Sequence, residues 1–177
     1  DGGASRTTVD DDIEASTEYR QDEVESLYGH YLGRAADISG LDYFTAELAS
    51  GGTVEQVAAA LAGSPEFVQA HGGSGSLVDA LFNTVLGRSA DAGSLALFQQ
   101  ELAAGATASQ IAAQILAGDE HQQQLAGALL TRFLDRPADA SGVNFFAADL
   151  HAGATDEQVA GDILGSQEFF AKASEGS

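Results

Sequence analysis

The chain has 177 residues, 44% of them hydrophobic, and carries 27 acidic against seven basic side chains, a formal net charge of −20. This charge argues against nucleic-acid and anionic membrane partners, because both require a basic face. No cysteine is present, which excludes a disulfide framework, a thiolate metal site and a cysteine nucleophile. No apolar run reaches the roughly 18 residues of a membrane span, so we expect no membrane insertion.

Residues 1–22 are rich in acidic and small polar side chains, and we expect them to form a disordered acidic leader. The whole chain contains a single lysine, Lys172. An acidic protein nearly free of lysine is typical of a saline or extracellular setting. We therefore expect a protein that is secreted or displayed on the bacterial cell surface.

After the leader, one pattern occurs three times. Each copy contains Arg-x-x-Asp, then a core aromatic, and then Thr-x-x-Gln, with the arginines at Arg34, Arg88 and Arg136. Self-similarity at this period predicts a stacked array of one supersecondary unit. Arg34 and Arg88 are 54 residues apart, and Arg88 and Arg136 are 48 residues apart. These two spacings define which residues of the three copies correspond to one another.

Each copy reads as short helices in chain order. In the first copy, apolar residues at helical spacing predict a helix that ends at Gly33 and a second one capped by Ser39. Thr53 begins a third helix, and Ser64-Pro65 begins a fourth. The predicted fold is all-α, an array of three homologous repeats of about four short helices each.

The spacing of the copies predicts their boundaries. We expect repeat 1 over 23–71, a Gly/Ser hinge over 72–76, repeat 2 over 77–121, and repeat 3 with a short tail over 122–177. The second junction lacks glycine-serine residues and reads as one continuous helix. Repeats 2 and 3 should therefore move as one body, with repeat 1 hinged to them.

The recurring polar residues favour structural roles. Each Thr-x-x-Gln predicts a capping box, in which threonine and glutamine satisfy each other's backbone N–H groups. The arginine of Arg-x-x-Asp has two interpretations. It ties its loop to neighbouring carboxylates, such as Glu66, or it grips an anionic ligand.

Two loops could supply oxygen ligands to calcium: Asp37 with Ser39, and Asp139 with Ser141. Hard cations require several oxygens, and each loop offers one carboxylate besides hydroxyl and carbonyl groups. The alternative is an Asx turn that leads into a helix cap. Calcium is accordingly the one cofactor that the sequence suggests.

All four tyrosines lie in the first 43 residues. One interpretation gives repeat 1 a specialised face, on which Tyr28, Tyr31 and Tyr43 stack against a sugar and Asp37 contributes a hydrogen bond. The other interpretation is plain packing, since these positions match core positions of the later copies.

No catalytic motif stands out. The four histidines never pair at i, i+4, and the chain has neither a Gly-x-Ser-x-Gly elbow nor a phosphate-binding loop. We therefore expect a protein that is not an enzyme.

The pattern Leu-Gly-Arg-x-x-Asp-x-x-Gly-Leu, followed by Gly-x-Thr and Ser-x-Glu-Phe, runs from Tyr28 to Phe67 and recurs more loosely up to His121 and Phe169. It resembles a bacterial helical-repeat family of unknown function, found in secreted and surface proteins. It is more distantly similar to phycobilisome linker cores and to lipopolysaccharide-anchoring regions of S-layer proteins.

The resemblance and the residues together imply a non-catalytic binding or anchoring module. The expected partners are a glycan or surface polysaccharide and neighbouring domains of the same protein. The alternative is a calcium-stabilised structural scaffold in a larger secreted or surface-layer protein.

Overall fold

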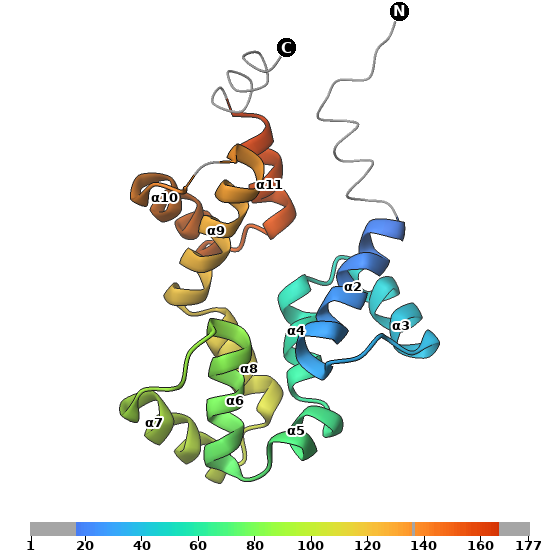
Figure 1. Cartoon of the computed structure of the whole chain (residues 1–177), viewed down its shortest axis with the longest axis vertical. Helices are drawn as coiled ribbons and strands as arrows, with labels where there is room; N and C mark the ends of the chain where they lie inside the picture. The colour runs from blue at the N-terminus through green and yellow to red at the C-terminus, as the bar shows by residue number, and fades with distance from the viewer. Residues whose placement is uncertain (1–16, 136, 167–177) are drawn as a thin grey trace, which may run out of the picture. The chain divides into compact units, whose positions relative to one another are not determined.

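A computed structural model describes residues 17–135 and 137–166, and this part of the chain folds into α-helices joined by short loops (Figure 1). The helices are α2 (Thr17–Leu32), α3 (Ile38–Ala49), α4 (Val54–Ala62), α5 (Pro65–His71), α6 (Ser74–Leu86), α7 (Ala92–Ala103), α8 (Ala108–Leu116), α9 (Asp119–Leu134), α10 (Ala140–His151) and α11 (Asp156–Leu164). The predicted all-α fold is confirmed. None of these helices is long and apolar enough to cross a bilayer.

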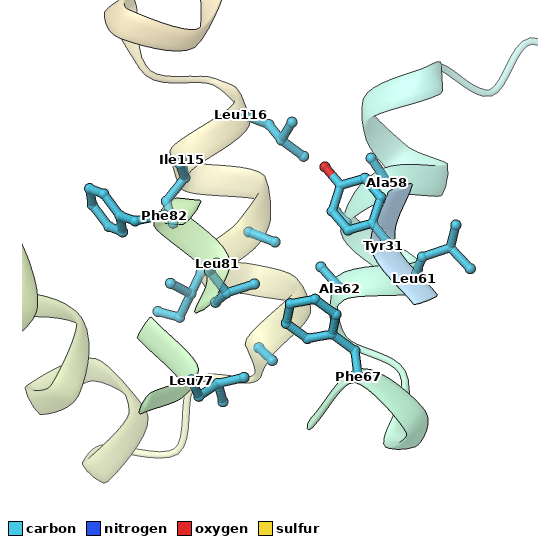
Figure 2. Close-up of a cluster of buried hydrophobic side chains, with 14 of the residues drawn as sticks. Tyr31, Ala58, Leu61, Ala62, Phe67, Leu77, Leu81, Phe82, Ile115 and Leu116 are labelled. Carbon is cyan, nitrogen blue, oxygen red and sulfur yellow. The ribbon is translucent and has the colours of Figure 1, made fainter. Parts of the chain in front are cut away.

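The described residues form two compact units, 17–118 and 119–166. In the first unit, α4 packs against α8, α2 packs against α3 and α4, and α6 packs against α7 and α8. Side chains from these helices meet in one core, which Figure 2 shows from Tyr31 and Phe67 across to Leu81 and Ile115. Repeats 1 and 2 are thus joined by a shared apolar interior.

In the second unit, α9 packs against both α10 and α11. Its core contains Leu130 and Leu134 from α9, Leu150 from α10, and Ile163 from α11. This unit has the same helix pattern as each earlier copy, with α9 in the place of α2 and α6.

The segment predicted as a hinge over 72–76 differs in the structure. Only Gly72 and Gly73 lie outside helices, because Ser74 already begins α6. Phe67 and Leu77, on either side of the break, are buried in one core. The division between the compact units falls instead after Gly118, since the packing of α4 on α8 joins the first two copies.

Close approach of α4 and α8 depends on Gly63. A Cβ on Gly63 would lie 2.5 Å from Cβ of Ser109 and 2.8 Å from its backbone nitrogen. Any side chain there would force the two repeats apart.

Among the other predictions on local structure, one is wrong in part and several are confirmed. The prediction of a disordered leader over 1–22 is wrong for residues 17–22, which belong to α2, and residues 1–16 lie outside the described part. A continuous helix does cross the second junction, as α9. All three capping boxes are confirmed, at Thr53, Thr107 and Thr155, as is the Ser64 cap of α5.

Candidate functional site

The aspartate of Arg-x-x-Asp caps a helix in every copy. Oδ1 of Asp37 accepts hydrogen bonds from the Gly40 backbone N–H (2.9 Å) and from the Ser39 hydroxyl (2.6 Å). Asp91 caps α7 and Asp139 caps α10 in the same way. The prediction that Ser39 caps this helix is therefore wrong, because the longer aspartate side chain reaches the free N–H groups and the serine supports it.

These bonds stabilise the charged aspartate. The pKa of Asp37 is lowered, chiefly by the Ser39 hydroxyl and then by the Gly40 N–H. Of the predicted calcium ligands, Ser39 and Ser141 thus lie in the first turns of α3 and α10, and Asp37 and Asp139 already cap these helices. Across the described residues, no three His, Cys, Asp or Glu side chains group as a metal site. Calcium binding at these loops stays a prediction.

Arg34 holds its loop to the next helix. Nε and Nη2 donate to the two carboxylate oxygens of Glu66, at 2.8 and 2.7 Å, and Nη1 donates to the Ala35 carbonyl at 2.9 Å. The guanidinium also lies 5.2 Å from the ring centre of Tyr28. The pKa of Glu66 is lowered, mainly by the bond from Arg34. The structural interpretation therefore holds for Arg34, whose donors are committed within the fold.

The second copy repeats part of this arrangement. Arg88 donates to the Ser89 carbonyl at 3.0 Å and lies 5.2 Å from the ring centre of Phe82. The third arginine, Arg136, lies outside the described residues.

The tyrosines do not form the shared face predicted from the sequence. Tyr28 and Tyr31 are only 5% and 7% exposed, whereas Tyr43 is 66% exposed. Tyr28 packs edge-on against Phe44, and Tyr31 packs against Phe67. A sugar cannot stack on rings buried in this way, so Tyr28 and Tyr31 are corrected to core residues, and Tyr43 alone remains accessible.

The described residues hold a pocket elsewhere, between the N-terminal end of α9 and the part of α10 from Asn144 onward. Its volume is about 450 Å³, within the usual range of small-molecule sites. Polar side chains line it: Asp119, Gln122, Gln123, Asn144 and His151. Three alanines, at 147, 148 and 152, complete the lining. We call this the α9–α10 pocket.

The matched positions of the second copy show what is special about this pocket. Where α9 and α10 carry Gln122, Gln123, Asn144 and His151, the second copy has the small residues Ser74, Gly75, Ala96 and Ala103. Conversely, Gln99 stands where the pocket has Ala147. The Gln99 amide lies so close to Gly75 that a Cβ there would be 2.9 Å from Nε2. Compared with the second copy, the third copy therefore lacks a filling side chain and carries more hydrogen-bonding groups around the space.

An exposed aromatic ring lies on α10, one of the two helices that line the pocket. Phe145 is 63% exposed and packs edge-on against Phe146, with ring centres 5.1 Å apart. Helical periodicity places Phe145 on the same side of α10 as Ala148, which lines the pocket. Amides that donate and accept hydrogen bonds, next to an accessible ring, suit a ligand with many hydroxyl groups.

These residues were not predicted from the sequence, because the tyrosines of repeat 1 carry the stronger chemical signal for sugar binding. A signal for the pocket was present in the sequence. Small residues of α7 are replaced by polar ones at the matched positions of α10, and α10 also carries the alanine pair at 147 and 148.

The chain matches the family described as a domain of unknown function (DUF4214) over residues 3–71 and 117–173. It belongs to this family. The two matched segments contain repeat 1 and most of repeat 3, and the pocket lies within the second segment. Neither a curated protein nor a solved structure matches the chain.

Proposed function

We propose that this DUF4214 chain is a non-catalytic carbohydrate-binding module of a secreted or cell-surface protein, and that its ligand site is the α9–α10 pocket. The observation that carries the proposal is the gathering of two glutamines, an asparagine and a histidine around one pocket, at positions that are small in the second copy. A side chain with both donors and acceptors complements sugar hydroxyls, which also do both.

The architecture favours binding over catalysis. The pocket lies between two packed helices, and three alanines are part of its lining. Asp119 and His151 lie with Oδ1 and Nδ1 3.7 Å apart, and no serine, threonine or cysteine lines the pocket beside them. The pair thus has no hydroxyl or thiol nucleophile to activate there.

The proposal is tested by filling the pocket. The full chain is screened on a glycan array, and the affinity for each positive glycan is measured by calorimetry. Ala147→Gln places in α10 the residue that α7 already accepts at the matched position, so folding should survive. We expect binding to weaken by at least about tenfold, because the new amide occupies the ligand volume. Ala128→Gln, on an exposed position of α9 outside the pocket, is the matched control.

Individual hydrogen bonds supply a second readout. Asn144→Ala or Gln123→Ala should weaken binding by about three- to tenfold each, the usual effect of one lost hydrogen bond. A chain that binds no glycan on the array, or an Ala147→Gln variant that binds as well as the unaltered chain, overturns the proposal.

A further inference from the structure

The α9–α10 pocket has an acidic rim and no cationic lining residue. Asp119 begins α9, and its side chain is 84% exposed beside the pocket. The remaining lining residues are amides, alanines and His151. Asp119 is thus the one carboxylate in the lining, which contains neither lysine nor arginine.

The nearest arginine along α9 cannot offset this charge. Arg132 lies in the last turn of α9, thirteen residues after Asp119, which is roughly 20 Å along a helix. This separation exceeds the screening length of about 8–10 Å at moderate ionic strength. The guanidinium of Arg132 is also placed 5.4 Å from the ring centre of Phe133. The helix termini contribute opposite partial charges, positive at the start of α9 and negative at the end of α10 beside His151.

The whole chain adds a field of the same sign as the rim. A net charge of −20 attracts cations and repels anions at long range. A carboxylate or sulfate on the ligand would meet this field and the Asp119 carboxylate, with no lysine or arginine in the lining to bind it.

We infer that the saccharide taken by this pocket carries a protonated amine, so that the ligand class is an amino sugar. The inference rests on the proposed function and narrows its ligand. An ammonium group donates three hydrogen bonds. The Asp119 carboxylate accepts one of them with charge assistance, and the side-chain carbonyl groups of Asn144 and Gln123 are further acceptors in the lining.

Three disaccharides with the same backbone test the inference: cellobiose, the chitosan dimer that carries amines at carbon 2, and cellobiouronic acid. Affinities for the full chain are measured by calorimetry slightly below neutral pH, at low and at high salt. We expect the amine to bind about fivefold more tightly than cellobiose at low salt, the size of one exposed charge pair. The ratio should fall toward one at high salt, and the acid should bind most weakly.

Matched variants locate the effect. Asp119→Asn should abolish the preference for the amine, measured as the ratio of the two affinities, whereas Asp162→Asn removes an equal charge from α11, outside the pocket, and should preserve the preference. Because Nδ1 of His151 lies 3.7 Å from Oδ1 of Asp119, the comparison is repeated with His151→Gln, which should keep or increase the preference.

The outcomes separate the two proposals. Equal binding of cellobiose and the amine, or tighter binding of the acid, overturns the inference and leaves saccharide binding in place. A preference that survives Asp119→Asn also overturns it. If none of the three disaccharides binds, the inference falls, and the glycan array decides independently whether the proposed function falls with it.

Discussion

The first and second helical copies, residues 23–71 and 74–116, share one core and one polar framework, yet they differ in their aromatic residues. Tyr28 and Tyr31 of the first copy correspond to Phe82 and Val85 of the second. Each ring at the first of these positions packs on the next helix, Tyr28 against Phe44 and Phe82 against Phe98. Both copies thus use an aromatic ring at this position to pack the two helices together. The hydroxyl of Tyr28 is present only in the first copy and needs additional space there.

The space for this hydroxyl comes from a glycine, whose order with the neighbouring serine differs between the two copies. The first copy reads Ser39-Gly40 and the second reads Gly93-Ser94. A Cβ on Gly40 would overlap the hydroxyl oxygen of Tyr28 and lie 2.9 Å from its Cζ. Phe82 has no hydroxyl, so a side chain is allowed at the matched Ser94, where its hydroxyl donates to Asp91 at 2.7 Å. The comparison teaches that the tyrosine in the first copy constrains its neighbour through packing.

The sharpest test of this comparison uses the hydroxyl of Tyr31, which only the first copy buries. Burial raises the pKa of Tyr31 from 10.0 to about 12. Because the folded-state pKa exceeds the unfolded value, the stabilisation is complete below pH 10 and is lost as the pH rises toward 12 and beyond. We expect the free energy of unfolding to fall by about 2–3 kcal/mol from this group.

The measurement is chemical denaturation at a series of alkaline pH values, comparing the unaltered chain with Tyr31→Phe. The variant should lose less stability over this range, by the stated amount. Tyr43→Phe, which removes the hydroxyl of an exposed tyrosine in the same copy, is the matched control. Identical alkaline profiles for the unaltered chain and Tyr31→Phe would contradict the burial of this hydroxyl.

The next effect concerns Gly40. Gly40→Ala should destabilise the chain by about 1–3 kcal/mol, the usual cost of overpacking, because its Cβ would overlap the Tyr28 hydroxyl. The free energy of unfolding from urea denaturation measures the loss.

A double-mutant cycle provides the control. Tyr28→Phe combined with Gly40→Ala recreates the pairing of Phe82 with a Cβ-bearing residue, so the double variant should recover part of the stability. Ser94→Ala, in the second copy, should lack any such coupling to Phe82. Additive effects of Tyr28→Phe and Gly40→Ala would show that the hydroxyl is not what excludes a side chain at position 40.

The local framework could be predicted from the sequence because its signals are short-range. Capping boxes at Thr53 and Thr107 depend on residues three apart, and the Ser64-Pro65 start of α5 depends on adjacent ones. The three-fold recurrence of such signals also predicted the helical fold. The hinge could not be judged from the sequence in this way. The glycines at 72 and 73 suggest a flexible break, but α4 and α8 pack against each other because Gly63 has no side chain, and this packing joins the two copies.

The candidate site could not be read from the same signals. Tyr28 and Tyr31 are chemically suited to a sugar, but their register on α2 turns both into the core. The α9–α10 pocket arises from side chains that are missing, such as a large residue at 147, and from two helices whose packing brings Asp119 near His151. The space beside Ala147 can be recognised only by comparison with the second copy, where Gln99 stands at the matched position and its amide lies close to Gly75.

The smallest expected effect tests what the first two copies share. Gln56 N–H donates to Thr53 Oγ1 at 3.3 Å, and the second copy repeats this bond between Gln110 and Thr107 at 3.2 Å. Thr53→Ala and Thr107→Ala should therefore each destabilise the chain by about 1 kcal/mol, measured by denaturant unfolding. Thr→Ser at either position keeps the accepting hydroxyl and should retain most of the stability. Since both boxes begin the two helices that pack against each other, α4 and α8, equal losses would mean that the copies contribute alike to their shared core. A loss of stability in only one of the two variants would mean that the two copies differ in their capping boxes as well as in Tyr28 and Tyr31.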